Sequence, residues 1–175
     1  MKNMDYEFRA RAHNGRKGQS EIMEYVLMIV FIVAAIMAII FFLTWWNLEQ
    51  FKADAFKNKQ DRIAGIAQYM MGDYMFTNGE SIFDDAKLTA INATITCEDL
   101  QKILGTGWYV KIKALDMEGE APCKWNAYPG CNVWSMCGQR QDVTDRLGQN
   151  FPVNVYRKVT DKTALGIMYV EVYTL

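Results

Sequence analysis

The 175-residue sequence is poor in histidine and proline, and one long stretch of it has no charge. The single histidine, His13, lies close to the N-terminus. Because the region after residue 48 has no histidine, it cannot build a Ser-His-Asp triad, a Cys-His pair or a His-based metal site. No proline occurs in the first 76 residues, so nothing of that kind interrupts a long helix there. An enzyme is therefore not expected.

The stretch without charge covers residues 25–48. As a helix, its 24 residues would measure about 36 Å, and a bilayer's hydrocarbon core is about 30 Å thick. Tyr25 at one end and Trp45-Trp46 at the other stand where interfacial aromatic residues are enriched. A buried core helix and a removable secretory peptide are the alternatives. A secretory apolar region has only about 7–15 residues and precedes a small-residue cleavage site, so we predict a membrane-spanning helix.

Charge predicts the orientation of this helix. Residues 1–18 contain five Lys or Arg against two acidic residues, whereas the chain from Asn47 onward has fourteen against sixteen. Since positive flanks remain in the cytoplasm, we expect the leader inside and the C-terminal region outside the cell. The weak acidity of that outer region argues against a nucleic acid partner.

Four cysteines, all C-terminal to the uncharged span, fit an oxidising exterior; they are Cys97, Cys123, Cys131 and Cys137. An even number in a small extracytoplasmic domain predicts disulfides, with three possible connectivities. A zinc site is the rival interpretation, but the spacing lacks paired two-residue gaps and no histidine is nearby. We therefore expect no metal and no other cofactor. Cys131–Cys137 or Cys123–Cys137 would close the loop 121–138, leaving Cys97 to tie it to an earlier element.

Residues 47–76 have the apolar spacing of an amphipathic helix. The stripe consists of Leu48, Phe51, Ala55, Phe56, Ile63, Ile66, Ala67, Met70 and Tyr74. This face could pack on its own domain or against neighbouring copies of the chain, and the sequence does not distinguish these. Gly65 and Gly72 are places where the helix could bend or end.

The remaining residues predict a small β-rich domain. Thr77-Asn78-Gly79 is a turn signal, and the alternation of residues 91–96 predicts a short strand. Thr96 is then expected to cap a short helix, with Asp99 in its first turn and Leu104 at its end.

Two further segments have the period of strands. Residues 108–114 alternate apolar and polar side chains, and Val153, Val155 and Val159 mark another strand. Residues 160–163 would turn that strand back into residues 165–173, giving an antiparallel pair. The predicted fold class is α+β: a long N-terminal helix followed by a small antiparallel sheet or sandwich with disulfides.

Other candidate sites are few. Asp84-Asp85, Glu118 and Glu120 could bind calcium, but they lack EF-hand spacing and fit solvated loop charges better. Asn92-Ala93-Thr94 is an N-glycosylation sequon, with an unmodified strand residue as the alternative. The cysteine-bounded loop is rich in large side chains, namely Trp125, Tyr128, Trp134 and Met136. They could form a contact patch on the surface or fill the underside of the loop.

The junction before the apolar span carries a family resemblance. A basic leader ending in Arg16-Lys17-Gly18 is followed by Gln19-Ser20 and by Glu24 ahead of the apolar helix. This arrangement resembles the class III signal peptide of archaeal type IV pilin precursors. Glu24 is the sixth residue after the glycine, where such precursors usually place the acid fifth, and Glu21 is a second candidate for that acid.

The resemblance implies that a prepilin-type peptidase cuts between Gly18 and Gln19. Glu24 would then pair with the free N-terminal amine of an adjacent subunit and set subunit register. It implies a cell-surface filament of pilin-like subunits, with this chain as a minor pilin or pseudopilin. The expected organisation is a leader (1–18), a transmembrane helix (19–48), an amphipathic helix (49–76) and a β-rich domain (77–175). An unprocessed membrane-anchored binding or accessory domain is the alternative, with Ser20 capping the helix.

Overall fold

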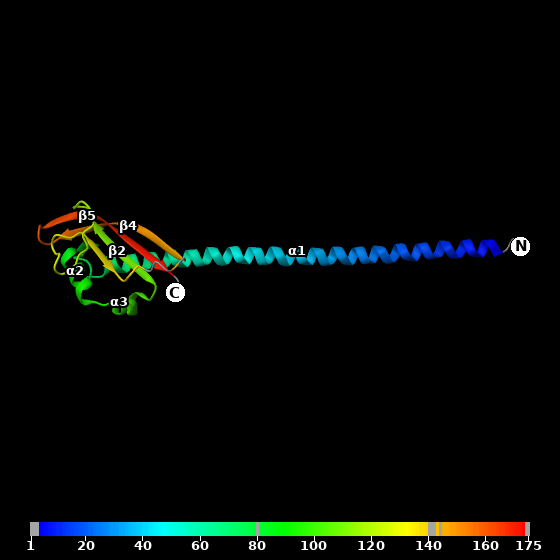
Figure 1. The fold of residues 1–175 in the computed structure, drawn as a ribbon, viewed down its shortest axis with the longest axis horizontal. Helices are drawn as coiled ribbons and strands as arrows, with labels where there is room; N and C mark the ends of the chain where they lie inside the picture. Colours follow the sequence, from blue (N-terminus) through cyan, green and yellow to red (C-terminus); the bar gives the residue numbers. More distant parts are fainter. Residues whose placement is uncertain (1–3, 80, 140–142, 144, 174–175) are drawn as a thin grey trace. The chain divides into compact units, whose positions relative to one another are not determined.

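The structure is a computed structural model. It describes residues 4–79, 81–139, 143 and 145–173, with side chains from residue 22 onward. The chain divides into two compact units, one ending at Asp54 and the other beginning at Ala55. Helix α1, Met4–Gly72, supplies the first unit and the opening turns of the second (Figure 1). This is the α+β arrangement of a long apolar helix and a sheet that the composition predicts.

The C-terminal turns of α1 belong to the core of the second unit. Ile63, Ile66, Ala67 and Met70 are 0–3% exposed and share one hydrophobic cluster with the sheet. Their three- and four-residue spacing places them on one helix face. This part of the predicted stripe therefore packs on its own domain. Tyr74, which we expected to continue the stripe, lies beyond the end of α1 at Gly72 and is 77% exposed.

In the part of the chain that the structure describes, five strands form one mixed sheet in the order β1-β4-β5-β2-β3. Their bounds are Ile82–Asp84 (β1), Trp108–Ala114 (β2), Val133–Met136 (β3), Arg146–Arg157 (β4) and Lys162–Tyr173 (β5). β1 pairs with β4 in parallel, and the other pairs are antiparallel. We expected a small antiparallel sheet or sandwich, and the structure has one sheet that is mostly antiparallel, with a parallel pair at one edge.

The alternation in β2 and β5 separates a core face from an outer face. Trp108, Val110 and Ile112 are fully buried on the core face. β2 has the predicted bounds, and β4 and β5 form the predicted antiparallel pair. Val159, which we expected in a strand, lies in the turn after β4 and is 62% exposed.

The predicted strand at residues 91–96 is wrong. Residues Asp85–Thr94 form helix α2, and Asp84 caps it by accepting hydrogen bonds from the amides of Ala86 and Lys87. Leu88 and Ile91 face the core. The Ile/Thr alternation has a strand-like period, but Ile91 and Ile95 are also four residues apart, which is a helical spacing. The cap after β1 and the buried face favour the helix.

The following helix, α3, spans Cys97–Leu104 as predicted. The Thr96 side chain accepts a hydrogen bond from the Asp99 amide, so Thr96 is the N-cap. The predicted turn at residues 77–79 is also present, with Gly79 in the left-handed region at φ +83°.

Candidate functional site

The first candidate is the apolar segment of α1, defined here as residues 22–48. Every large apolar side chain in this segment is at least 50% exposed, and Glu24 is its single charged residue. A core helix of a soluble domain would bury one face, and this segment buries none. The part of α1 from Ile22 to Gly72 is long and apolar enough to cross a membrane.

The residues of the proposed cleavage junction lie within the α1 backbone. Gly18, Gln19 and Ser20 are inside the helix that begins at Met4, so Ser20 does not stand at a helix N-terminus as the capping alternative requires. The structure does not describe the side chains of these three residues. Glu24 is exposed on α1 and available to a partner, and its role in subunit register remains a prediction.

The second candidate is the cysteine-bounded loop between β2 and β3. The predicted disulfides are present as Cys97–Cys137 and Cys123–Cys131. Cys97 does tie the region to an earlier element, α3, but the bridge inside the loop is neither of the two we expected. Strand β3 lies between Cys131 and Cys137 and extends the chain by about 3.3 Å per residue. The two Cα atoms are therefore kept apart, beyond the 4.4–6.8 Å that a disulfide spans.

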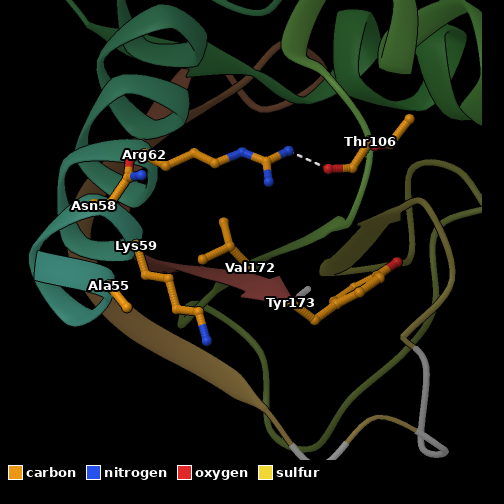
Figure 2. Close-up of a pocket in the computed structure, with 7 residues that line it drawn as sticks. All are labelled: Ala55, Asn58, Lys59, Arg62, Thr106, Val172 and Tyr173. Carbon is orange, nitrogen blue, oxygen red and sulfur yellow. Dashed lines mark hydrogen bonds between the residues drawn. The ribbon is translucent and has the colours of Figure 1, made fainter. Parts of the chain in front are cut away.

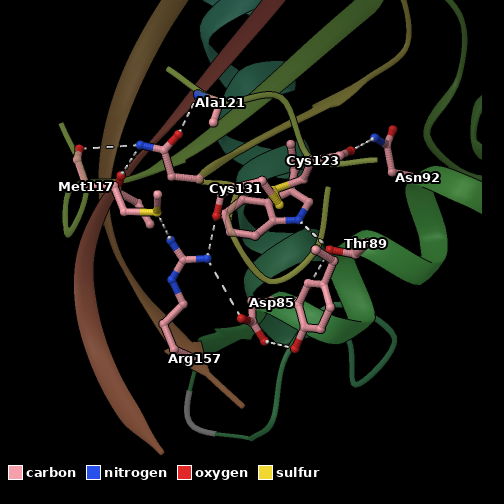
Figure 3. The surroundings of a disulfide bond; sticks show 12 residues. Asp85, Thr89, Asn92, Met117, Ala121, Cys123, Cys131 and Arg157 are labelled. Atoms are coloured by element: carbon pink, nitrogen blue, oxygen red, sulfur yellow. Dashed lines mark hydrogen bonds and ion pairs between the residues drawn. A yellow bond between two sulfur atoms is a disulfide. The ribbon is translucent and has the colours of Figure 1, made fainter. Parts of the chain in front are cut away.

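The Cys123–Cys131 loop is held by a charged network (Figure 3). The Arg157 guanidinium donates to the Cys131 carbonyl at 2.8 Å and to both carboxylate oxygens of Asp116 at 2.8 Å. It also lies 5.3 Å from the Trp134 ring centroid, a cation–π contact, and 3.8 Å from the buried Asp85 carboxylate. Hydrogen bonding from Arg157 lowers the pKa of Asp116 below its usual range.

Tyr128 connects the loop to the same network. Its hydroxyl donates to Asp85 at 3.2 Å, and the Lys158 amide donates to the same oxygen at 3.1 Å. Burial, together with the Asp85 charge and hydrogen bond, raises the pKa of Tyr128 to about 12, so the hydroxyl stays protonated. The loop backbone is thereby fixed from several directions.

The aromatic side chains around this loop have two different roles. Trp134 and Met136 are buried, and the Trp134 indole N–H donates to the Thr89 hydroxyl at 2.9 Å. Trp125, by contrast, is 76% exposed. One tryptophan, Trp134 in β3, is therefore part of the core, and the other, Trp125 in the loop, faces the surroundings.

Asn92 lies in α2 rather than in a strand. Its side-chain nitrogen donates to the Cys123 carbonyl at 2.9 Å, although the residue is exposed (Figure 3). One amide hydrogen makes this bond and the second stays available, so the geometry is compatible with a glycan on that nitrogen. Glycosylation remains a prediction.

Three of the four acidic residues considered for calcium, all except Glu118, make other contacts. Asp84 caps α2, Asp85 faces Arg157, and Glu120 binds Lys111 and Lys113. Within the part of the chain that the structure describes, no group of three or more His, Cys, Asp or Glu side chains is placed to hold a metal ion.

A cleft of about 300 Å³ separates the early turns of the second unit's helix from the end of β5 (Figure 2). Arg62 extends from α1 and donates to the Thr106 carbonyl, and Lys59 forms an ion pair with Asp145. Val172 and Tyr173 line the opposite side. Both cations join the helix to neighbouring loops. These contacts stabilise the packing of α1 within the unit, and they leave neither cation unpaired in the cleft.

The sequence predicted the apolar segment and the disulfides, but it missed the Arg157 network. Arg157 and Asp85 are 72 positions apart, and no local motif links them. Comparison with protein-family models, with curated proteins and with solved structures finds no match for this chain.

Proposed function

We propose that this protein is a structural subunit of a type IV pilus-like filament, as a minor pilin or pseudopilin. The observation that carries the proposal is the exposed apolar segment, residues 22–48, in the same helix that supplies core residues to a folded domain. Lipid would cover this segment before assembly, and the corresponding segments of other subunits would cover it afterwards.

Glu24 supports an assembly role. A charged side chain costs about 3 kcal/mol at the centre of a membrane helix, and less near its end, and an ionic partner would offset this cost. In the proposed filament the partner is the α-amine of Gln19 from an adjacent subunit, released when the peptidase cuts after Gly18. A charge pair in an apolar bundle would fix the axial position of each subunit.

The domain would stand outside the cell. Its two disulfides fit an oxidising compartment, and a basic leader before the span favours the orientation with the N-terminus inside. The membrane and other pilin-like subunits are the expected partners.

N-terminal sequencing and intact mass of the protein purified from its native membrane test the processing step. We expect a chain that begins at Gln19. A mature protein that retains Met1 would overturn the pilin-like proposal, and the unprocessed anchor would then be the better account.

Glu24→Gln tests the register role, with Glu49→Gln as the matched control just beyond the apolar segment. Both side chains are exposed on α1, and both changes remove one charge with little change in shape. We expect Glu24→Gln to abolish recovery of filaments in the sheared surface fraction while the protein still reaches the membrane, and Glu49→Gln to assemble normally. Equal assembly of the two variants would remove the role of Glu24.

A membrane-anchored binding domain is the second candidate, and the exposure of Trp125 favours it. A side chain 76% exposed on a loop closed by a disulfide and held by Asp85 and Arg157 is suited to contact a partner. Retention of Met1, with Trp125→Ala abolishing cell-surface function, would support this alternative over the filament.

A further inference from the structure

The outer face of the sheet carries a cavity whose lining includes neither a disulfide cysteine nor a residue of α1. It has a volume of about 360 Å³, and residues of β2, β5 and β4 contribute to its lining. These three strands are neighbours in the sheet (Figure 1). Its lining residues on β2 and β5 alternate with the buried core residues of those strands, so the cavity is on the face opposite the core. Its volume falls within the range of small-ligand sites, about 300–1,000 Å³.

Two tyrosines give the cavity an aromatic surface. The rings of Tyr109 and Tyr169 pack edge to face, with centroids 6.4 Å apart and planes at 63°. Gly148 on β4 makes room for this arrangement, since a Cβ there would come within 2.2 Å of the Tyr169 hydroxyl oxygen. An aromatic face is electronegative and attracts the weakly positive C–H groups of a ligand placed against it.

The cavity also contains fixed hydrogen-bonding groups. Lys111 and Lys113 both bind Glu120, with nitrogen–oxygen distances of 2.6 and 3.3 Å, so one carboxylate holds two ammonium groups in place. The amides of Gln139 and Asn150 also line the cavity and offer both donors and acceptors. Such a mixture suits hydroxyl groups, which both donate and accept.

A buried carboxylate holds two of the lining side chains in place. Glu171 is 1% exposed and accepts hydrogen bonds from the Tyr169 hydroxyl at 2.8 Å and from Gln139 at 3.0 Å. Burial and the hydrogen bond to Glu171 raise the pKa of Tyr169 to about 12, so its hydroxyl keeps donating to the carboxylate. Two lining groups are thus held before any ligand arrives, which reduces the entropy lost on binding.

We propose that this cavity binds a pyranose ring of a surface glycan. One C–H face of the sugar lies against the tyrosine pair, and its hydroxyls bond to the amides of Gln139 and Asn150 and to the Lys111–Glu120–Lys113 group. The glycan would be met outside the cell, where the proposed function places the domain. Binding itself requires neither processing nor assembly.

The test uses the full-length chain in a detergent without a sugar headgroup. Mannotriose, which is neutral, and trigalacturonate, which is acidic, are titrated by calorimetry, with saturation-transfer NMR to identify the ring that is contacted. A single ring in such a site should bind with a dissociation constant on the order of 1 mM. Binding of either saccharide supports the proposal, and a preference for trigalacturonate would assign the lysines to a sugar carboxylate.

Matched variants locate the site. We expect Tyr169→Leu and Asn150→Ala to weaken binding at least tenfold, and Tyr156→Leu, on the same sheet face outside the cavity, to leave it unchanged. Asn150 is exposed, so its variant decides the matter if Tyr169→Leu does not fold. Absence of binding by the unmodified chain, or equal binding by Asn150→Ala, would overturn the proposal. The Glu24→Gln variant should bind normally, which separates this result from that of the filament proposal.

Discussion

Two segments of one helix, α1, differ in the exposure of similar apolar side chains. In residues 22–48 the apolar side chains surround the helix and are all exposed, whereas Ile63, Ile66 and Met70 form a narrow stripe that is almost completely buried. The stripe finds its partner within the chain. Within the described residues the apolar segment has no such partner, which is consistent with a helix that could span a membrane. The distribution of polar residues around the helix decides between these outcomes.

Placing a carboxylate in each segment should give the largest effect. Ile63 is fully buried and Ile36 is 50% exposed. We expect Ile63→Asp to unfold the domain, because an unpaired charge enters the core, and Ile36→Asp to leave the domain folded but to impair membrane insertion. Limited proteolysis reports the first effect and membrane fractionation the second. If both variants unfold the domain alike, the two segments do not differ as we describe.

Removing Arg157 should affect the domain alone. Arg157→Ala leaves the buried Asp85 carboxylate without its ionic partner, so we expect a loss of about 3–5 kcal/mol in the free energy of unfolding. Lys158→Ala is the matched control, since Lys158 contributes its backbone amide to Asp85 and retains it in the variant. Denaturation followed by tryptophan fluorescence measures both. A similar loss in the two variants would contradict the role of the guanidinium.

The two disulfides should differ in their contribution to stability. Cys97–Cys137 closes a loop with a sequence separation of 40, and Cys123–Cys131 one of 8. Loop-closure entropy predicts losses of about 4 and about 2.5 kcal/mol when each pair is replaced by alanine. Denaturant titration of the two double variants checks the order. Membrane insertion of α1 should be unaffected in both, and an insertion defect would count against the independence of the two units.

The smallest expected effect is on the stability of the domain at acidic pH. Because Arg157 lowers the pKa of Asp116 in the folded state, the unfolded state binds its proton first as the pH falls. The stabilisation from this pair is therefore present above a pH of about 4 and is lost as the pH falls through the folded-state pKa. The Asp116→Asn variant should show a flatter decline in melting temperature between about pH 5 and 2. An unchanged pH profile would exclude Asp116 as a source of acid sensitivity.

Local signals explain what could be predicted. The capped helix α3 and the strand β2 have their predicted positions, because Thr96 and the alternation of residues 108–114 act over a few residues. The strand predicted at residues 91–96 was wrong because two isoleucines four residues apart fit the period of a strand as well as that of a helix. Burial of Leu88 and Ile91 against the core favours the helix.

Long-range pairing explains what could not be predicted. The path of β3 determines which cysteines meet, and no spacing rule contains that path. The outer-face cavity likewise depends on strand register, which places Tyr109 opposite Glu171 and Lys111 opposite Tyr169. Those residues are about sixty positions apart, and only the antiparallel pairing of β2 with β5 brings them together.

The position of β5 in the sheet has a consequence for biogenesis. β5 is made after every other strand, yet it lies between β4 and β2 and joins the pair β1-β4 to the pair β2-β3. A chain whose β5 has not yet been made therefore has two separate strand pairs and lacks the strand that joins them into one sheet. All four cysteines precede β5 and emerge earlier, so wrong bridges can form before the sheet brings the correct partners together. Faithful oxidation of this protein should depend on the arrival of its last strand.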